Sequence, residues 1–396
     1  MKTIETSLAG IRLKNPFLLA SGPSAATGAM IARAFEAGWG GAVTKTIHSD
    51  SLAVDDVSPR FGAVRDEQGA VLAFENIEQI SKRSVTQWVS DIRLLKREWP
   101  GHAVIASVMA PVTPTDWQDL AQTLEDAGAD ALELNLSCPN GLPEKGLGQA
   151  LGQDADLAAT LTGWVKQKVR IPVMPKLTPN VTSIAAVGRA VQAAGADAVA
   201  AINTVSGILG VDLETWTPYP VVAGYSTLGG VSGAAMKPLG LRAVAELSAA
   251  LNIPVSGMGG IRTASDTVEY LLLGATTVQV CTAVMVHGYG VIDRLTAGLR
   301  AYLARKQLGS VRDLVGQSLG RLVAHHELSR AARVRPSFGA ACVLCGRCVT
   351  ACRDAAYQAL CLQGGLLSLD LARCDGCSLC EQVCPNRAVH MVERSS

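Results

Sequence analysis

Polar and nucleophilic residues meet first in the stretch Glu133–Asn140, which reads ELNLSCPN. Apolar residues lead into it from Ala129, and Pro139 ends the predicted buried strand because it has no N–H to donate to a neighbouring strand. Two amides, a hydroxyl and the Cys138 thiol are therefore expected together at the carboxyl end of a strand. In a barrel of parallel strands that end carries the active site, although a single cysteine is often only a small buried apolar residue.

A second chemical group is formed by nine of the 11 cysteines, which lie between Cys342 and Cys384. Eight of them form two runs with the pattern C-x-x-C-x-x-C-x-x-x-C, at Cys342, Cys345, Cys348 and Cys352 and at Cys374, Cys377, Cys380 and Cys384. This spacing is typical of bacterial two-cluster ferredoxins, in which the fourth cysteine of each run ligates the other cluster. We therefore predict two [4Fe–4S] clusters, one on Cys342, Cys345, Cys348 and Cys384 and one on Cys374, Cys377, Cys380 and Cys352.

Zinc fits these runs less well, because zinc sites usually use one or two C-x-x-C pairs. Gly346 and Gly376 are expected to ease the tight backbone around the thiolates. Arg353 stands where such a run usually has proline, and Cys361 lies outside both runs and is expected in the core. A ferredoxin-like domain transfers single electrons, so the rest of the chain should hold a two-electron centre, and a flavin is the natural converter.

Glycines and lysines at predicted strand ends favour a flavin phosphate site. The stretch Ser256–Ile261 reads SGMGGI between a strand and a helix, where backbone N–H groups can approach a phosphate. The next strand ends at Cys281 and Thr282, and barrels often bind phosphate after their last two strands. Lys45 and Lys176 also lie at strand ends, where a lysine can stabilise negative charge on a flavin ring.

The elements that must position these residues repeat as strand, helix and glycine turn. Eight strands are predicted, at 17–20, 41–45, 103–108, 131–136, 172–176, 198–202, 254–257 and 277–281. Helices are predicted between them near 25–37, 78–97, 115–127, 155–169, 183–194, 238–251, 264–273 and 288–305. Eight such units in about 300 residues predict a (β/α)₈ TIM barrel. A doubly wound sheet is the alternative, weakened by the lack of G-x-G-x-x-G after the first strand.

The pattern divides the chain into three parts. We expect a barrel over 1–306, a helical connector over 307–338 and a two-cluster ferredoxin-like domain over 339–396. Within the connector, Ser310–Asp313 resembles a helix start, and 335–339 is expected to be a linker because it contains proline, serine and glycine. The pair His325 and His326 is a weak ligand candidate, because adjacent residues face different sides of a helix.

Composition excludes several classes of function. Hydrophobic residues make up 48% and charged residues 17% of the 396 residues, so a large core is expected. The formal net charge is +1 without a basic stripe, and aromatic residues are only 4%, which argues against nucleic-acid binding. The chain lacks both a long apolar run and an apolar N-terminal signal region, so we expect a cytoplasmic protein without a membrane span.

Together these motifs resemble the dihydroorotate/dihydropyrimidine dehydrogenase family over nearly the whole chain. NLSCPN resembles both branches. The fused ferredoxin segment resembles the dihydropyrimidine branch, which includes the pyrimidine-reducing catalytic subunits of bacterial NAD-dependent enzymes. Four short motifs resemble the same branch: FENIE at 74–78, KLTPN at 176–180, NTVSG at 203–207 and GGVSG at 229–233. Asn140 departs from this branch and is common in the dihydroorotate branch.

The resemblance implies roles for individual residues. FMN would be held by Ala20, Ser21, Lys45, Thr46, Lys176, Gly233, Gly259, Gly260, Ile261, Cys281 and Thr282. A pyrimidine would be bound by Asn76, Asn135, Ser137, Asn203 and Thr204, with Glu78 close by, and Cys138 would be the general acid.

The implied reaction is the reversible reduction of uracil or thymine to the 5,6-dihydropyrimidine. Hydride would come from N5 of FMN and a proton from Cys138, whose thiol is mostly protonated at neutral pH if its pKa is near 8.5. Electrons would come from a separate NAD(P)H-oxidising flavoprotein subunit, so a homo- or hetero-oligomer is expected. The alternatives are a dihydroorotate dehydrogenase, a related reductase of another cyclic amide, and an electron carrier whose barrel is only a scaffold.

Overall fold

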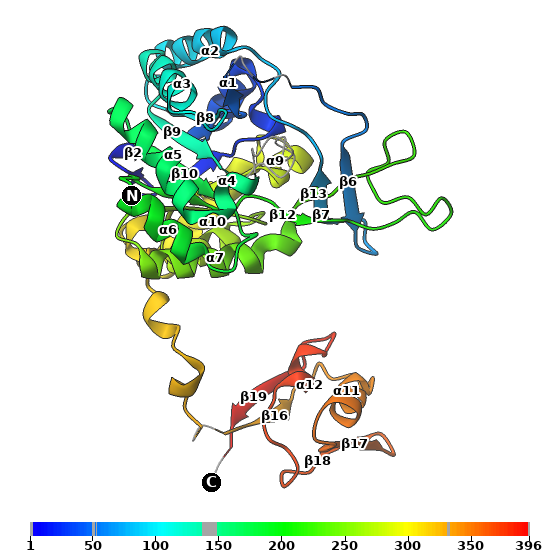
Figure 1. Cartoon of the computed structure of the whole chain (residues 1–396). Coiled ribbons are helices and arrows are strands. Elements are labelled where there is room, and N and C mark those ends of the chain that lie inside the picture. The colour runs from blue at the N-terminus through cyan, green and yellow to red at the C-terminus, as the bar shows by residue number, and fades with distance from the viewer. Residues whose placement is uncertain (1–2, 50–51, 53, 137–148, 331–332, 395–396) are drawn as a thin grey trace. The chain divides into compact units, whose positions relative to one another are not determined.

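The computed structural model describes residues 3–49, 52, 54–136, 149–330 and 333–394. The chain forms two compact units, Met1–Arg321 and Leu322–Ser396, which are described separately (Figure 1). The part of the chain described contains no helix long and apolar enough to cross a membrane.

The first unit is built around eight parallel strands that close into a barrel. They are β3 (Phe17–Leu19), β4 (Gly41–Val43), β8 (Ala103–Met109), β9 (Ala131–Asn135), β10 (Val173–Leu177), β11 (Val199–Ala201), β14 (Val255–Met258) and β15 (Ala275–Val280). Closure is direct, because β4 pairs with both β3 and β8. The predicted TIM barrel is therefore confirmed, and a doubly wound open sheet is excluded. Short β5 (Ile47–His48) extends the pairing beside β8.

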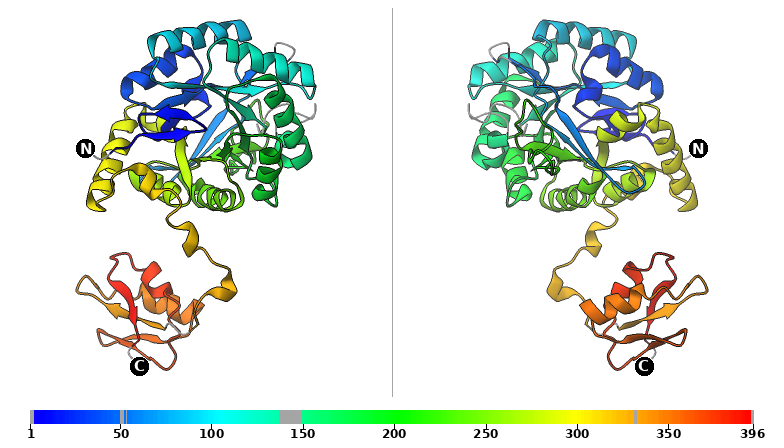
Figure 2. Two further views of the ribbon diagram at one scale, coloured as in Figure 1. Left: turned by 90° about the vertical axis from the view of Figure 1, so that its left-hand side faces the viewer. Right: turned by 90° about the vertical axis from the view of Figure 1, so that its right-hand side faces the viewer.

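Helices surround this barrel, as Figure 2 shows. They are α1 (Gly28–Ala37), α2 (Val85–Glu98), α3 (Pro114–Asp126), α4 (Gln149–Gln153), α5 (Ala155–Lys168), α6 (Ile184–Ala193), α7 (Lys237–Ala250), α8 (Ala264–Leu272), α9 (Thr282–His287) and α10 (Val291–Arg305). The glycine turns occur as predicted: Gly128, Gly195 and Gly274 all have φ near +100°.

Three helices differ from their predicted ranges, each for a local reason. The helix predicted from 78 begins at Val85, because Ser84 and Gln87 form a capping box there. The helix predicted from 25 begins at Gly28, after the Thr27 cap. The helix predicted over 288–305 begins later, at Val291, because α9 precedes it and is capped by Gly288 with φ +77°.

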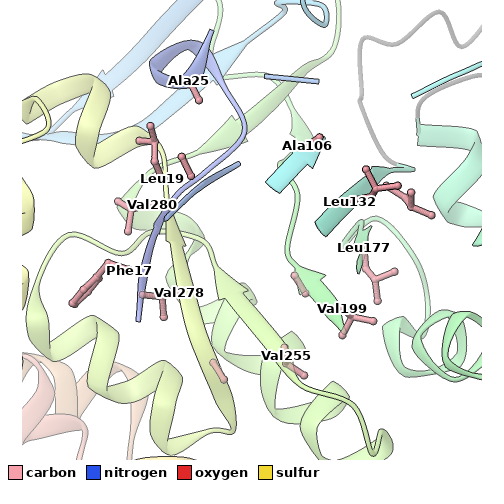
Figure 3. Packing of buried hydrophobic residues seen from close by; sticks show 14 of the residues in the cluster. Phe17, Leu19, Ala25, Ala106, Leu132, Leu177, Val199, Val255, Val278 and Val280 are labelled. Atoms are coloured by element: carbon pink, nitrogen blue, oxygen red, sulfur yellow. The ribbon is translucent and has the colours of Figure 1, made fainter. Parts of the chain in front are cut away.

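The strands of the barrel separate two apolar regions. Outward-facing residues pack against the helices, and Figure 3 shows Phe17 and Leu19 of β3 beside Val278 and Val280 of β15. Inside the barrel, a smaller apolar cluster is closed by the hairpin of β1 (Thr6–Leu8) and β2 (Ile11–Leu13). Because side chains alternate along a strand, the residues between the outward-facing ones point into the barrel.

A four-stranded antiparallel sheet is added to the barrel and was not predicted. Its strands run in the order β12 (Val205–Gly207), β13 (Gly229–Ser232), β7 (Val71–Asn76) and β6 (Phe61–Arg65). They come from two excursions, one after β5 and one after β11. The sheet therefore brings residues 61–76 beside residues 205–232.

The described part of the second unit contains two short two-stranded antiparallel sheets and two helices. Strand β16 (Val334–Phe338) pairs with β19 (Val389–Glu393), and β17 (Leu360–Gln363) pairs with β18 (Leu366–Leu369). The helices are α11 (Arg347–Ala355) and α12 (Leu379–Gln382). Gly346 and Gly376 have φ +74° and +83°, the conformation expected where the backbone turns around the cysteines.

Two expectations for the C-terminal region were wrong. Residues 335–339 are not a free linker, because most of them form β16. Pro336 is tolerated there since a two-stranded ribbon leaves one edge of each strand without a partner. Cys361 is not a core residue but is exposed, because alternation along β17 turns Leu360 inward and Cys361 outward.

The connector has local structure as well. Ser310 caps a short 3₁₀ helix, Val311–Leu314, as the sequence indicated. The division at Arg321 falls inside the predicted connector, while the predicted domain limits at 306 and 338 stay predictions. His325 and His326 lie on an exposed 3₁₀ turn.

Candidate functional site

A cavity of about 340 Å³ lies at the carboxyl end of the barrel strands. Its wall is formed by the ends of β3, β10, β14 and β15 and by the β6–β7 and β13 segments of the antiparallel sheet. This volume is in the range of small-molecule sites, and the carboxyl end is where TIM barrels place their chemistry.

The residues that the sequence assigned to FMN all line this cavity. They are Ala20, Ser21, Lys45, Thr46, Lys176, Gly233, Gly259, Gly260, Ile261, Cys281 and Thr282. Four of the five predicted pyrimidine-binding residues line it too, namely Asn76, Asn135, Asn203 and Thr204. The fifth, Ser137, and the predicted acid Cys138 lie outside the described residues, as does Asn140.

A glycine loop after β14 forms one wall. Gly259 and Gly260 have φ +123° and +70°, a conformation that other residues rarely adopt. A Cβ at Gly260 would lie 2.7 Å from the backbone nitrogen of Lys237. The loop is therefore built from bare backbone, which can approach a phosphate closely.

The buried Tyr270 of α8 supports this loop from behind. Its hydroxyl donates to the carbonyl oxygen of Gly259 at 2.7 Å and lies 3.2 Å from that of Met258. Burial raises the pKa of Tyr270, so the hydroxyl remains a donor. Sequence reasoning missed this residue, because nothing in a helical apolar stripe marks one tyrosine as a support for a loop.

Two lysines bring positive charge to the cavity wall, and each is paired. Lys45 Nζ lies 2.8 Å from Glu78 Oε2, and Arg60 contacts the other oxygen at 3.3 Å. Lys176 Nζ lies 3.7 Å from Glu133 Oε1. The inner wall is thus close to electrically balanced around these lysines.

Glu133 also binds Gln279 across the barrel, at 2.7 Å from Oε2 to Nε2. Neither residue was assigned a role from the sequence. The available signal was alternation: Glu133 is two residues before Asn135 and Gln279 is two before Cys281, so each shares the inward face of its strand.

A chain of amides and hydroxyls forms the polar side of the cavity. Asn135 Nδ2 donates to Thr46 Oγ1 at 2.8 Å, and Asn203 Nδ2 lies 3.5 Å from Asn135 Oδ1. Thr204 Oγ1 is buried and has no hydrogen-bond partner among the described residues. A buried hydroxyl without a partner is costly, so a ligand group would satisfy it.

Asn180 of the predicted KLTPN motif holds this side in place. Its Nδ2 donates to the carbonyl oxygen of Thr204 at 3.2 Å, and its Oδ1 accepts from the Ser206 backbone at 3.0 Å. The motif therefore links β10 to the segment that carries Asn203 and Thr204.

The antiparallel sheet completes the wall opposite the barrel. Asn76 Nδ2 donates to the carbonyl oxygen of Gly230 at 3.3 Å. Ser232 Oγ lies 2.9 Å from Thr282 Oγ1 and so joins the sheet to the start of α9. Ser232 is another lining residue that was not assigned from the sequence.

Cys281 contributes packing to this wall. A Cβ on Gly22 would lie 2.6 Å from its sulfur, so the thiol fills the space that the glycine leaves. Burial raises the pKa of the Cys281 thiol, which keeps it neutral at physiological pH.

The cysteines of the second unit surround two small cavities, each of about 20 Å³. Cys342, Cys345, Cys348 and Cys384 line one, and Cys352, Cys374, Cys377 and Cys380 line the other. The two groups of four are the ones that the spacing predicted. All ten cysteines in the described ranges are free, and within those ranges no group of three or more His, Cys, Asp or Glu residues is arranged to hold one metal ion.

The chain is similar to known proteins over most of its length. Residues 3–303 match the family model described as dihydroorotate dehydrogenase. The chain belongs to the dihydroorotate dehydrogenase family. Residues 338–391 match the model described as 4Fe-4S dicluster domain, so this family member carries an iron–sulfur domain.

Individual relatives come from both branches of the family. The chloroplastic dihydropyrimidine dehydrogenase (NADP(+)) of Arabidopsis thaliana is 37% identical over 82% of this chain and 79% of its own length. The NAD-dependent dihydropyrimidine dehydrogenase subunit PreA of Escherichia coli K12 is 36% identical over 91% and 87%. The catalytic subunit of dihydroorotate dehydrogenase B (NAD(+)) of Pyrococcus abyssi is 37% identical over 80% and 99%. The chain is therefore an oxidoreductase, and its resemblance to this family is confirmed.

Proposed function

We propose that this chain is a catalytic subunit that reversibly reduces uracil or thymine to the 5,6-dihydropyrimidine. FMN would occupy the barrel cavity, and two [4Fe–4S] clusters would occupy the second unit. The observation that carries the substrate class is the side of the cavity formed by Asn135, Asn203 and Thr204. Amides offer both donors and acceptors, which suits a neutral ring with alternating N–H and C=O groups.

The cavity wall fits a flavin mononucleotide on three counts. The loop at Gly259 and Gly260 presents backbone to a phosphate, and Lys45 and Lys176 offer cations to a ring. Thr204 Oγ1 and Gln279 Oε1 are buried without partners among the described residues, so polar groups of a ligand would satisfy them. When bound, FMN would supply hydride transfer and would exchange electrons one at a time with iron–sulfur centres.

The residues of the chain would then bind, orient and protonate the pyrimidine. Asn76, Asn135 and Asn203 would hold the pyrimidine by its edge, and Asn180 would keep the Thr204 segment in place. Cys138 would donate the proton at C5 of the ring from its thiol and would act as the base in the reverse direction. Since the relatives PreA and the dihydroorotate dehydrogenase B protein are named as subunits, we propose a NAD(P)H-oxidising flavoprotein partner that delivers electrons to the clusters.

Dihydroorotate oxidation is the second candidate, because a relative from that branch covers 80% of the chain. Orotate carries a carboxylate and would require an available cation. Both lysines on the described part of the inner wall are paired with Glu78 and Glu133 and are assigned to the flavin, which favours a neutral ring as the substrate. Arg65 and Arg262 also line the cavity, so a direct comparison of substrates is needed.

The test is anaerobic photoreduction of purified protein, followed by uracil, thymine or orotate in separate cuvettes. Recovery of the oxidised flavin spectrum with uracil or thymine, and not with orotate, is the expected result. Faster recovery with orotate would replace the proposal by dihydroorotate oxidation. If none of the three compounds restores the oxidised spectrum but another cyclic amide does, the chain would be a related reductase. A chain whose iron–sulfur clusters are reduced but which shows no flavin absorbance that bleaches would be an electron carrier only.

A pair of variants separates binding from folding in this assay. Asn203→Ala should raise KM for uracil, because it removes an amide from the cavity wall. Asn252→Ala is the matched control, since Asn252 is exposed and does not line the cavity. The partner is tested separately: NADH alone should not drive uracil reduction by the purified chain, whereas a reduced viologen dye should.

A further inference from the structure

Three polar side chains lie together inside the barrel, next to the apolar interior. Glu133 on β9, Lys176 on β10 and Gln279 on β15 all point inward, and their exposed fractions are 0%, 6% and 1%. Lys176 and Gln279 line the cavity, whereas Glu133 is not one of the lining residues. Glu133 therefore lies behind the side chains that face a ligand.

The contacts of Glu133 define its charge environment. Oε2 accepts a hydrogen bond from Gln279 Nε2 at 2.7 Å, and an ionised carboxylate, which can only accept, requires the nitrogen of the amide to face it. Oε1 lies 3.7 Å from Lys176 Nζ and has no hydrogen-bond partner among the described residues. At this distance the carboxylate and the ammonium group form an ion pair but not a close hydrogen bond. Glu133 therefore offsets the charge of Lys176 without direct contact.

We propose that Glu133 is a positioning residue that lowers the reduction potential of the bound flavin by partly cancelling the charge of Lys176. The inference rests on the proposed FMN site. A flavin gains negative charge when it is reduced, and Lys176 on the cavity wall favours that change. Glu133 opposes it from behind, and its effect is strong because both charges lie in a region of low dielectric constant.

The test is the midpoint potential of the bound flavin in the full chain, measured for variants that change charge or shape separately. Glu133→Gln keeps the size and removes the charge, and Glu133→Met does the same with an apolar side chain. Both should shift the potential to more positive values. Glu133→Asp keeps the charge and should remain near wild type.

Sulfite affinity gives an independent measurement, because sulfite adds to flavins more tightly when positive charge near the ring is uncompensated. Loss of one charge several ångströms away should tighten sulfite binding by about tenfold or more at an effective dielectric constant near 20. The matched control is Glu75→Gln, since Glu75 is also fully buried but lies on β7 and does not line the cavity. That control should leave sulfite binding and the potential unchanged.

The outcomes distinguish a failure of the proposed function from a failure of the role assigned to Glu133. Wild-type protein without FMN would overturn the proposed function itself. Flavin-loaded Glu133→Gln and Glu133→Met with wild-type potentials would overturn only the role of Glu133. The same follows if Glu133→Asp shifts the potential as far as Glu133→Gln, because shape and not charge would then be what matters. If both charge-removing variants lose FMN while Glu133→Asp retains it, the charge is needed to hold the flavin, and the role in setting its potential is overturned as well.

Discussion

Replacing Tyr270 by phenylalanine tests how the glycine loop is held. The hydroxyl is the group that supports the carbonyl oxygen of Gly259, at 2.7 Å. The carbonyl oxygen of Met258, at 3.2 Å from the same hydroxyl, also accepts from the backbone N–H of Ile202 at 3.1 Å. Tyr270→Phe therefore leaves one part-buried carbonyl group, that of Gly259, without this partner.

The expected magnitude follows from that single loss. A buried carbonyl that loses its partner costs about 1–3 kcal/mol, so the free energy of unfolding should fall by that amount. The hydroxyl is closely packed, since a Cβ on Gly240 would lie only 1.9 Å from the tyrosine oxygen. If half of the cost falls on the loop that is proposed to contact the phosphate, FMN affinity should drop by roughly twofold to tenfold.

The measurements are urea unfolding of the flavin-free protein and FMN titration by fluorescence quenching. Tyr302→Phe is the control, since Tyr302 lies on α10 and its removal leaves the loop contacts intact. A Tyr270→Phe protein with wild-type stability and FMN affinity would show that the hydroxyl does not support the loop. An equal loss of stability and FMN affinity in Tyr302→Phe would show that removal of any tyrosine hydroxyl has this effect.

Three further predictions concern the thiols and the loop. Cys138→Ala should retain flavin and iron but lose nearly all uracil turnover, and a near-normal rate would remove Cys138 from the acid role. Cys384→Ser should lower the iron and sulfide content by about half, because the Cys384 thiol lines only the cavity that Cys342, Cys345 and Cys348 also line. Loss of both clusters, or of neither, would contradict this assignment. Gly260→Ala should abolish FMN retention, since its Cβ would lie 2.7 Å from the Lys237 nitrogen, and full flavin content in purified protein would refute this.

The barrel was predictable because its signals are local. Strands such as 131–136 are apolar runs that end at polar residues, and glycines such as Gly128 and Gly195 mark each return to the sheet. Helix starts depend on a few capping contacts, so the start of α2 was misplaced where Ser84 and Gln87 supply the cap. Boundaries follow from single side chains, whereas the existence of an element follows from many.

The antiparallel sheet could not be predicted in the same way. Its strands are short, β6 is mostly exposed, and β13 begins with two glycines, so no clear alternation marks them. Their pairing joins segments more than 150 residues apart, such as Gly230 with Asn76. Residues such as Asn76 were found by resemblance, and their place on the cavity wall became visible only with the sheet.

The cysteine runs represent the opposite case. Their spacing alone divided eight cysteines into two groups of four, and the same groups surround the two cavities of the second unit. Metal-ligand spacing is a strong signal because short gaps restrict which thiolates can share one site. Cys361 was misplaced since the surrounding ribbon is too thin to bury both of its faces.

The polar interior at the carboxyl end of the barrel is difficult to explain by folding alone. The apolar clusters outside and inside the strands already provide two extensive cores. Burying Glu133 and Lys176 removes two charges from water, and buried ion pairs seldom add stability compared with apolar residues of the same size. These charges are therefore better understood as parts of a binding site that the barrel must stabilise. For this reason we expect Glu133→Met to fold, to keep FMN and to change the potential of the flavin more than the stability of the protein.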